Sequence, residues 1–361
     1  MSASGQPAAP ARRANVVGLG LIGASVALGL AERGWHVTGD DTDPARLAQA
    51  LELDVVHERG LDPAAELTVV AVPVLAVPEQ VKRALAETVG VVTDVGSVKR
   101  PIVSAVDDPR FVGGHPMAGS ELEGLDGADA SLFGGAVWVL TPTASTADAT
   151  FATVAAVAAE LGAEVVALDP GRHDELVAVV SHVPHLTAAT LMGLASERAE
   201  EHAALLRLAA GGFRDMTRIA AGHPAIWIDI CAENRDAILV ALDGLLARLG
   251  EIRGLVADDE RARLLDRLQS AREARANLPG RATQPARLAE VRIPIPDRPG
   301  AAAEVFTLAA ELGVNITTFE VVHSAEGNRG VAVVLVDAEA SELFRGGLLA
   351  RGFRPAVERL G

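Results

Sequence analysis

The chain has 361 residues, of which 49% are hydrophobic and 22% are charged. This composition is typical of globular proteins and excludes a wholly disordered chain, and a usual domain size of roughly 150 residues predicts two or three domains. The 32 basic and 48 acidic residues give a formal net charge of −16, which argues against a surface that binds nucleic acid or anionic membranes. The single cysteine, Cys231, excludes an internal disulfide and a cysteine-based zinc site, and it favours a reducing cytoplasm.

Two segments bear on targeting and membrane insertion. Residues 1–13 are small and proline-containing and lack an apolar core, so we expect a disordered tail and not a signal peptide. The segment 176–195 runs 20 residues without Asp, Glu, Lys or Arg, which is long enough to span a bilayer. It contains His182, Pro184 and His185, which would be costly facing lipid, so we expect a helix buried inside protein.

Residues 14–169 alternate apolar β-type runs with Ala- and Leu-rich helical segments. Strands joined by helical crossovers predict an α/β domain with a mainly parallel, doubly wound sheet of the Rossmann type. The expected strands are 15–18, 35–39, 68–72, 91–94, 111–113, 136–140 and 164–168.

Residues 170–277 have helical patterns and almost no strand signal. Asp169 and Pro170 supply an N-cap and a proline at the first helical position. The helices expected at 177–207 and 226–248 are apolar around much of their circumference and need neighbours on all sides. We therefore predict an all-helical domain that forms a homodimer.

The composition changes again near the C-terminus. Residues 278–287 are a linker by their proline and glycine content. Residues 288–361 have the order β-α-β-β-α-β, which predicts a small ferredoxin-like α+β domain. Its expected elements are strand 291–295, helix 301–312, strand 316–322, a turn at 326–330, strand 331–336, helix 342–351 and strand 355–359.

A glycine motif follows the first predicted strand and opens a helix. Gly18 permits a tight turn, Gly20 lets a pyrophosphate approach the backbone and Gly23 allows close helix–strand packing. The second strand ends in Asp40 and Asp41, where an acid would bind the ribose hydroxyls of NAD and repel a 2′-phosphate. The spacing favours Asp41, and the cofactor predicted is NAD.

Polar residues also follow two neighbouring predicted strands. Ser97 lies after strand 91–94, and His115 lies after strand 111–113 between glycines. Parallel α/β sheets bind ligands at the carboxyl ends of their strands, so both side chains are expected to face the nicotinamide. Oxidation of a carbinol needs an acceptor for the hydroxyl hydrogen, and a neutral histidine suits that role.

Two further segments are candidates for substrate contact. His182 and His185 share a helical face, and ligand contact is favoured over a metal because no carboxylate or cysteine stands at ligand spacing. The planar guanidinium groups of Arg214 and Arg218 are suited to bind a substrate carboxylate through two parallel hydrogen bonds. The alternative role for these arginines is a solvated ion pair with Asp215.

Together these segments resemble the ordered motif set of prephenate dehydrogenases, and the C-terminal stretch resembles an ACT regulatory domain. The resemblance covers almost everything from residue 15 to the end. It implies NAD-dependent oxidative decarboxylation of prephenate to 4-hydroxyphenylpyruvate, on the route to tyrosine. The motifs that carry it are Gly18–Gly23, Asp94–Lys99, His115–Glu121, Ser181–His185 and Gly211–Ala220 with Trp227, and then Asp297–Gly300 and Gly313–Ile316.

The resemblance also implies roles for individual residues. His115 would accept the hydrogen bond of the ring hydroxyl, and Ser97 would bond both that hydroxyl and the histidine. Arg218 would clamp a carboxylate, and His185 would help to bind the substrate. Glu121 would gate the pocket mouth.

The partners of Glu121 in this gate would be Arg214 and Asp215, from the other subunit. Arg214 stands where lysine is also common, which leaves the gate possible with altered geometry. Arg172 precedes His173 and Asp174 where an acid is often found, a departure that we expect to affect only a helix start.

In the ACT-like segment, Asp297, Gly300 and Asn315 are the expected contacts of a regulatory amino acid. Backbone N–H groups at a helix start suit its carboxylate, and Asn315 suits its polar groups. Tyrosine is the expected effector, with phenylalanine second. The alternative is a domain that only strengthens dimerisation.

The sequence leaves three alternative functions to compare with this one. Arogenate, with an amino group in place of the keto group, is an alternative substrate that no single residue decides. A β-hydroxyacid dehydrogenase would normally need a lysine in the helical domain, and none occurs between Gly171 and Gly250. A non-enzymatic nucleotide and amino-acid sensor would need a DNA-binding element or basic patch, and the sequence shows neither.

Overall fold

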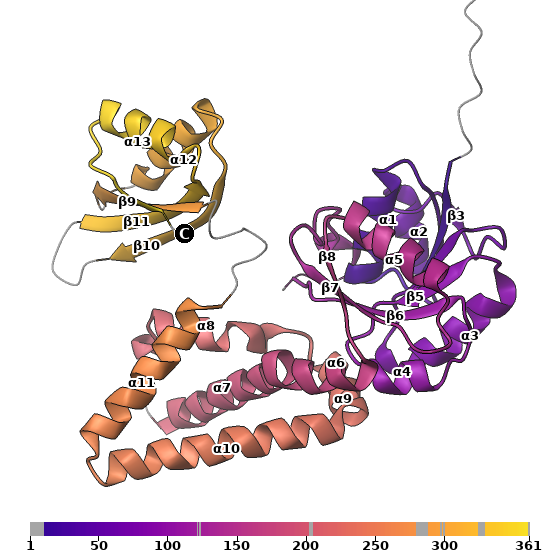
Figure 1. Cartoon of the computed structure of the whole chain (residues 1–361), viewed down its shortest axis with the longest axis horizontal. Helices are drawn as coiled ribbons and strands as arrows, with labels where there is room; N and C mark the ends of the chain where they lie inside the picture. The colour runs from indigo at the N-terminus through magenta and orange to yellow at the C-terminus, as the bar shows by residue number, and fades with distance from the viewer. Residues whose placement is uncertain are drawn as a thin grey trace, which may run out of the picture. The chain divides into compact units, whose positions relative to one another are not determined.

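The computed structural model describes residues 11–120, 122, 124–201, 205–278, 288–296, 298, 300–323 and 329–359. The chain forms two compact units, Met1–Ser270 and Ala271–Gly361 (Figure 1). Several predicted features lie outside the described residues: the tail up to residue 10, Glu121, the linker residues 279–287, Asp297 and most of the turn at 326–330.

An eight-stranded sheet opens the N-terminal unit, with strand order β3-β2-β1-β4-β5-β6-β7-β8. Neighbouring strands are parallel except β6 and β7. The predicted doubly wound, mainly parallel sheet is thereby confirmed. Its strands are β1 (Arg13–Val17), β2 (His36–Asp40), β3 (Glu58–Arg59), β4 (Leu67–Val70), β5 (Val91–Asp94), β6 (Phe111–Pro116), β7 (Val137–Thr141) and β8 (Glu164–Ala167).

Two details of the sheet differ from the prediction. The short edge strand β3 was not predicted, because two exposed polar residues carry no apolar periodicity. Strand β6 continues to Pro116, so His115 lies inside the strand and not in a loop after it. Pairing of β6 with β7 through His115 and Val139 extends the strand.

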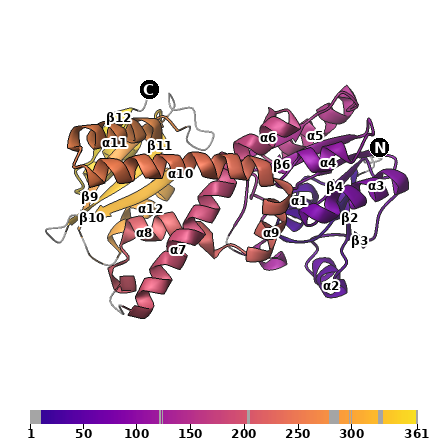
Figure 2. The same ribbon diagram turned by 90° about the horizontal axis from the view of Figure 1, so that it is seen from below.

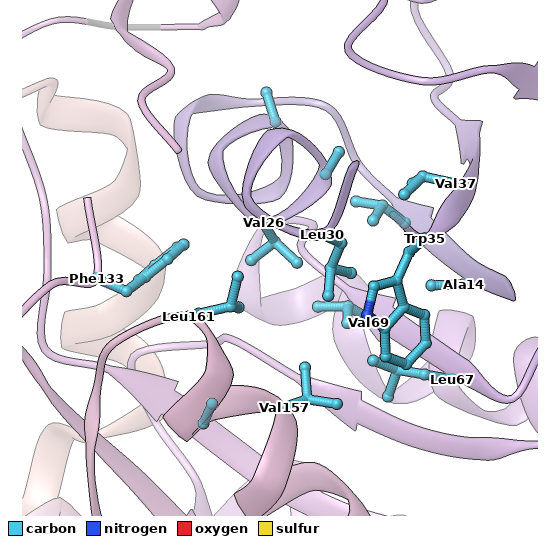
Figure 3. Close-up of a cluster of buried hydrophobic side chains, with 14 of the residues drawn as sticks. Ala14, Val26, Leu30, Trp35, Val37, Leu67, Val69, Phe133, Val157 and Leu161 are labelled. Carbon is cyan, nitrogen blue, oxygen red and sulfur yellow. The ribbon is translucent and has the colours of Figure 1, made fainter. Parts of the chain in front are cut away.

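Helices cover both faces of this sheet. On one face, α1 (Leu21–Ala31), α2 (Pro44–Glu52) and α5 (Asp148–Glu160) pack against the inward side chains of the strands. Figure 3 shows Val26 and Leu30 of α1 among residues that include Leu67, Val69 and Trp35. On the other face, α3 (Val77–Glu87) and α4 (Arg100–Ser104) form a second cluster. The carboxyl ends of the parallel strands β1 to β6 lie at one edge of the sheet.

A helical segment follows β8 (Figures 1 and 2). The helix predicted over 226–248 is divided at Asn234, which lies between the end of α9 and the start of α10. The first long helix is likewise divided into three parts, of which the middle one is a π-helical turn. The elements are α6 (Pro170–Val177), η3 (Ala178–His182), α7 (Val183–Glu201), η4 (Leu205–Leu208), α8 (Gly211–Thr217), η5 (Arg218–Ala221), α9 (Pro224–Glu233), α10 (Arg235–Ala257) and α11 (Arg261–Ala276).

The continuous run Pro170–Arg198 is long and apolar enough to cross a membrane, and among the described residues it is the one helix that passes this test. Within a single chain, 33% of its most apolar 18-residue segment is buried. The same run carries His173, Asp174 and His182, which are buried. The predicted burial of this helix inside protein is thus incomplete in one chain.

The C-terminal unit has the predicted β-α-β-β-α-β order and an antiparallel sheet in the order β10-β11-β9-β12, which is the ferredoxin-like arrangement. Its core includes Ile293, Val334, Phe344 and Leu348, all fully buried. The elements are β9 (Leu288–Pro296), α12 (Ala301–Glu311), β10 (Ile316–His323), β11 (Arg329–Asp337), α13 (Ser341–Ala350) and β12 (Ala356–Arg359).

Candidate active site

The glycine loop between β1 and α1 has the backbone that its motif requires. Gly18 has φ +89°, and a Cβ there would lie 2.4 Å from the carbonyl oxygen of Ala71. A Cβ on Gly23 would lie 1.9 Å from the carbonyl oxygen of Gly18. A Cβ on Gly20 would meet no atom within 4 Å, so the loop is open at the one glycine that a pyrophosphate must approach.

The two acids after β2 have different surroundings. The Leu19 backbone N–H donates to Asp41 Oδ2 at 2.7 Å, which fixes this carboxylate against the glycine loop. Arg46 Nη1 donates to the same oxygen at 3.2 Å. Asp40 instead accepts a bond from Arg83 at 2.6 Å. The geometry therefore favours Asp41 over Asp40 as the acid beside the cofactor loop.

His115 belongs to a chain of buried side chains that crosses from the sheet to the helical segment. Its Nδ1 lies 2.8 Å from Nε2 of His173, and Nδ1 of His173 lies 2.7 Å from Oδ1 of Asp174. The Asp174 carboxylate also accepts the backbone N–H groups of Lys99 and Arg100, each at 2.8 Å. His115 and His173 are 8% and 0% exposed, so this chain is shielded from water.

A buried ion pair supports the same region. Lys99 Nζ contacts Asp94 Oδ2, and both side chains are 0% exposed. Lys99 Nζ also donates to the carbonyl of Gly114 at 2.7 Å, and Asp94 accepts the N–H of Gly96 at 2.8 Å. The pair thus joins the end of β5 to the backbone immediately before His115.

Burial controls the protonation of His115. Desolvation lowers the pKa of His115 well below its usual 6.5, and the positive potential of His173, Lys99 and His182 lowers it further. Burial also lowers the pKa of Lys99, against the raising effect of Asp94. His115 is therefore neutral at neutral pH and has a lone pair available as an acceptor.

The π-helical turn Ala178–His182 and the break at Asn234 bring two more polar side chains inward. Asn234 Nδ2 donates to the Asp174 carbonyl at 2.8 Å and lies 3.2 Å from Nδ1 of His182. Burial lowers the pKa of His182 to about 4. Local departures from regular helix often occur at functional sites, and here they align the helices around Asp174.

His185 stacks on the indole of Trp227, with ring centroids 3.6 Å apart and an interplanar angle of 11°. The ring of His182 packs edge-on against the same indole, with ring centroids 6.1 Å apart. Burial lowers the pKa of His185, against a backbone hydrogen bond with Ile219 that raises it. The two histidines were predicted to act together on one helical face, but their surroundings differ. His182 belongs to the buried hydrogen-bond network, whereas His185 stacks on the indole of Trp227.

The remaining predicted site residues are placed less closely together. Ser97 is half-buried in the loop after β5, at the same sheet edge as His115. Arg214 and Asp215 are exposed on α8, and Arg214 Nε donates to the Ala209 carbonyl at 3.1 Å. Arg218 is exposed at the start of η5.

In the C-terminal unit, Gly300 precedes α12 with φ +89°, a left-handed conformation that favours glycine. Asn315 is exposed just before β10. The third predicted ligand contact, Asp297, is outside the described residues, as is Glu121.

Sequence reasoning missed the support for His115. No role was assigned from the sequence to His173 or Asp174, yet both side chains are buried beside His115. Arg172 itself is exposed and paired with Glu175. The sequence did contain a signal for this support. A His-Asp pair at the start of an otherwise apolar helix needs hydrogen-bond partners when it is buried. Among the described residues, no group of three or more His, Cys, Asp or Glu side chains has metal-binding geometry.

Comparison with known proteins gives two consecutive family matches, both within the first unit. Residues 26–167 match the family model of the prephenate dehydrogenase nucleotide-binding domain, and residues 169–270 match the prephenate dehydrogenase dimerization domain. Prephenate dehydrogenase of Bacillus subtilis is 33% identical over 334 residues, covering 88% of this chain and 90% of the relative.

Two solved structures show the same architecture. Aquifex aeolicus prephenate dehydrogenase in complex with hydroxyphenyl propionate and NAD+ superposes with a TM-score of 0.70 at 28% identity, over 75% of this chain and all of that one. Synechocystis arogenate dehydrogenase has a TM-score of 0.64 at 30% identity, over 73% of this chain and 99% of that one. The chain described here belongs to the prephenate dehydrogenase family.

Proposed function

We propose that the protein catalyses the NAD-dependent oxidative decarboxylation of prephenate to 4-hydroxyphenylpyruvate, a step of tyrosine biosynthesis. The observation that carries the proposal is a neutral, buried His115 at the end of the sheet where the glycine loop opens. The family supports the same reaction. A soluble biosynthetic enzyme of this kind fits the cytoplasm.

The residues of the first unit fit NAD. The open position at Gly20 and the start of α1 suit the pyrophosphate, and Asp41 suits the ribose hydroxyls. Bound NAD would supply a hydride acceptor. What remains for the protein is to orient the substrate and to control the hydroxyl proton.

His115 and Ser97 would bind the ring hydroxyl of the substrate. His115 accepts the hydroxyl hydrogen bond and holds the proton while the carbinol carbon is oxidised. Cleavage of the bond to the ring carboxylate releases CO2, and its electrons complete the aromatic ring and convert the carbonyl to a phenolate. The phenolate oxygen takes the proton back from His115 and becomes the phenol, so the protein gains and loses no proton overall.

The test is to follow NADH absorbance with prephenate and arogenate offered separately. Faster turnover of prephenate supports the proposal. Faster turnover of arogenate would assign the protein to the second activity, which the similarity to Synechocystis arogenate dehydrogenase keeps as an alternative. Absence of NADH formation with either substrate would contradict both.

Asp41→Ser is expected to reduce the preference for NAD over NADP by about 10-fold or more, since removing the carboxylate ends its repulsion of a 2′-phosphate and releases Arg46 toward it. The measurement is the ratio of kcat/KM for the two cofactors. Asp40→Asn is the matched control and should leave the ratio unchanged. A larger shift in the Asp40 variant would transfer the ribose-binding role to Asp40.

Arg218→Ala is expected to raise KM for the substrate by about 10–150-fold with a smaller change in kcat, because a charge-assisted bond to a carboxylate contributes roughly 1.5–3 kcal/mol. Arg207→Ala, which removes an exposed arginine of η4, is the control. An unchanged KM with a lower melting temperature would identify Arg218 as a structural residue. His185, stacked on Trp227, would complete this side of the pocket.

The helical domain is a dimerisation domain by its family model. We propose a homodimer, supported by large apolar side chains that are exposed in one chain, among them Val240, Leu246 and Val256 of α10. In that dimer, Arg214 and Asp215 of one subunit would meet Glu121 of the other as a charged gate.

We propose that the C-terminal unit is an ACT domain that binds tyrosine at Asp297, Gly300 and Asn315. Its ferredoxin-like topology supports the domain assignment. Tyrosine is expected to inhibit the full-length enzyme and to lose that effect after truncation at Leu278, provided that the truncated protein stays folded and active. Equal inhibition of both forms would place tyrosine in the active site instead.

A further inference from the structure

We infer that His173 and Asp174 are positioning residues that set the tautomer of His115, so that its Nε2 and not its Nδ1 faces the substrate hydroxyl. This inference rests on the proposed function, in which His115 is the acceptor. Neither residue touches the reacting atoms, since each acts through the ring before it.

The argument begins at Asp174. Its carboxylate accepts two backbone N–H groups, from Lys99 and Arg100, one at each oxygen, and lies 2.7 Å from Nδ1 of His173. A carboxylate that accepts backbone N–H groups at both oxygens acts as an acceptor toward the histidine ring as well. Nδ1 of His173 must therefore carry hydrogen.

The tautomer of His115 follows from that assignment. A neutral His173 with hydrogen on Nδ1 presents a lone pair at Nε2, which lies 2.8 Å from Nδ1 of His115. Nδ1 of His115 must then be the donor in this bond. Because His115 is neutral, its second nitrogen, Nε2, keeps the lone pair that the reaction needs.

The positions of both supporting residues are fixed by the fold. Asp174 bonds the start of α4 through Lys99 and Arg100, which ties α6 to the loop after β5. The side chains of His173 and Asp174 are 0% and 5% exposed, so water does not offer a competing partner. Without this support, either tautomer of His115 would be accessible.

Two substitutions at one position separate the role from packing. His173→Leu removes the acceptor, and we expect kcat to fall by about 10²–10⁴-fold, the range of general acid–base effects, with KM and NAD affinity within a few-fold. His173→Gln keeps an amide oxygen near the position of Nε2 and should retain kcat within about 10-fold of the parent enzyme. Glu175→Gln, an exposed position on the same helix, is the control.

A spectroscopic measurement tests the tautomer directly. Nitrogen NMR of the full-length enzyme with ¹⁵N-labelled histidine distinguishes ring nitrogens that carry hydrogen from those that do not, and His115→Asn assigns the signals. We expect hydrogen on Nδ1 and a bare Nε2 in His115, and a mixture of tautomers in His173→Leu. If that variant does not fold, the spectra of the parent enzyme and His173→Gln decide the matter.

The outcomes separate the two claims. If the parent enzyme oxidises neither prephenate nor arogenate, the proposed function fails while the NMR result still decides the tautomer. If the parent is active but His173→Leu keeps kcat within about threefold, or both variants at this position lose activity equally, the positioning role is refuted. Hydrogen on Nε2 of His115, or a protonated His173, would also overturn it.

Discussion

Replacing His115 with alanine is expected to lower kcat by about 10²–10⁴-fold while leaving the Kd for NAD nearly unchanged. In the proposed reaction this buried side chain of β6 is the acceptor, and its removal would leave the substrate hydroxyl without a partner for its proton. Steady-state kinetics and a titration with NAD measure the two quantities. The proposed cofactor residues lie in the loop after β1 and at the end of β2, away from this change.

His57→Asn is the matched control, because an exposed histidine is exchanged while an acceptor for the Val37 N–H is kept. The control should retain parental kcat. A His115 variant with kcat within a few-fold of the parent would show that this histidine is structural.

The pH profile of the parent enzyme offers a second check of the same group. Because burial lowers the pKa of His115 well below 6.5, the acceptor stays neutral until the pH falls through that lowered value. The acidic limb of kcat/KM that belongs to His115 should therefore lie below pH 6.5, with activity lost as the pH falls. A limb for this residue above pH 6.5 would contradict the buried, positively surrounded environment.

Lys99→Met is expected to reduce the free energy of unfolding of the N-terminal unit by about 3–5 kcal/mol. The substitution leaves the Asp94 carboxylate buried without its counter-charge, which costs more than the pair itself contributes. The measurement is equilibrium denaturation followed by tryptophan fluorescence. All three tryptophans, Trp35, Trp138 and Trp227, lie in the unit that carries the pair.

Lys82→Met is the control, since Lys82 is exposed on α3 and its loss should change stability by no more than about 0.5 kcal/mol. Adding Asp94→Asn to Lys99→Met removes the buried charge and should recover part of the loss. If Lys99→Met unfolds at the denaturant concentration of the parent, the pair contributes little, and the carbonyl of Gly114 is held by other contacts.

The amino-acid sequence by itself determined the features that depend on short-range patterns. The three glycines of the first loop, the acid at the end of β2 and the alternation of strands and helices follow from periodicity and backbone sterics within a few residues. For the same reason, the β-α-β-β-α-β order of the C-terminal unit was predicted with element ends within a few residues of those observed.

The support of the proposed catalytic histidine depends on the tertiary structure alone. His115 and His173 are 58 residues apart in sequence, and Lys99 and Asp174 are 75 apart, so no local pattern relates them. Their polar groups pair because burial removes water as a partner, and burial is a property of the packed helices and sheet. The break between α9 and α10 at Asn234 was likewise not predicted, and the Asn234 side chain contacts His182 and the Asp174 carbonyl, 52 and 60 residues away in sequence.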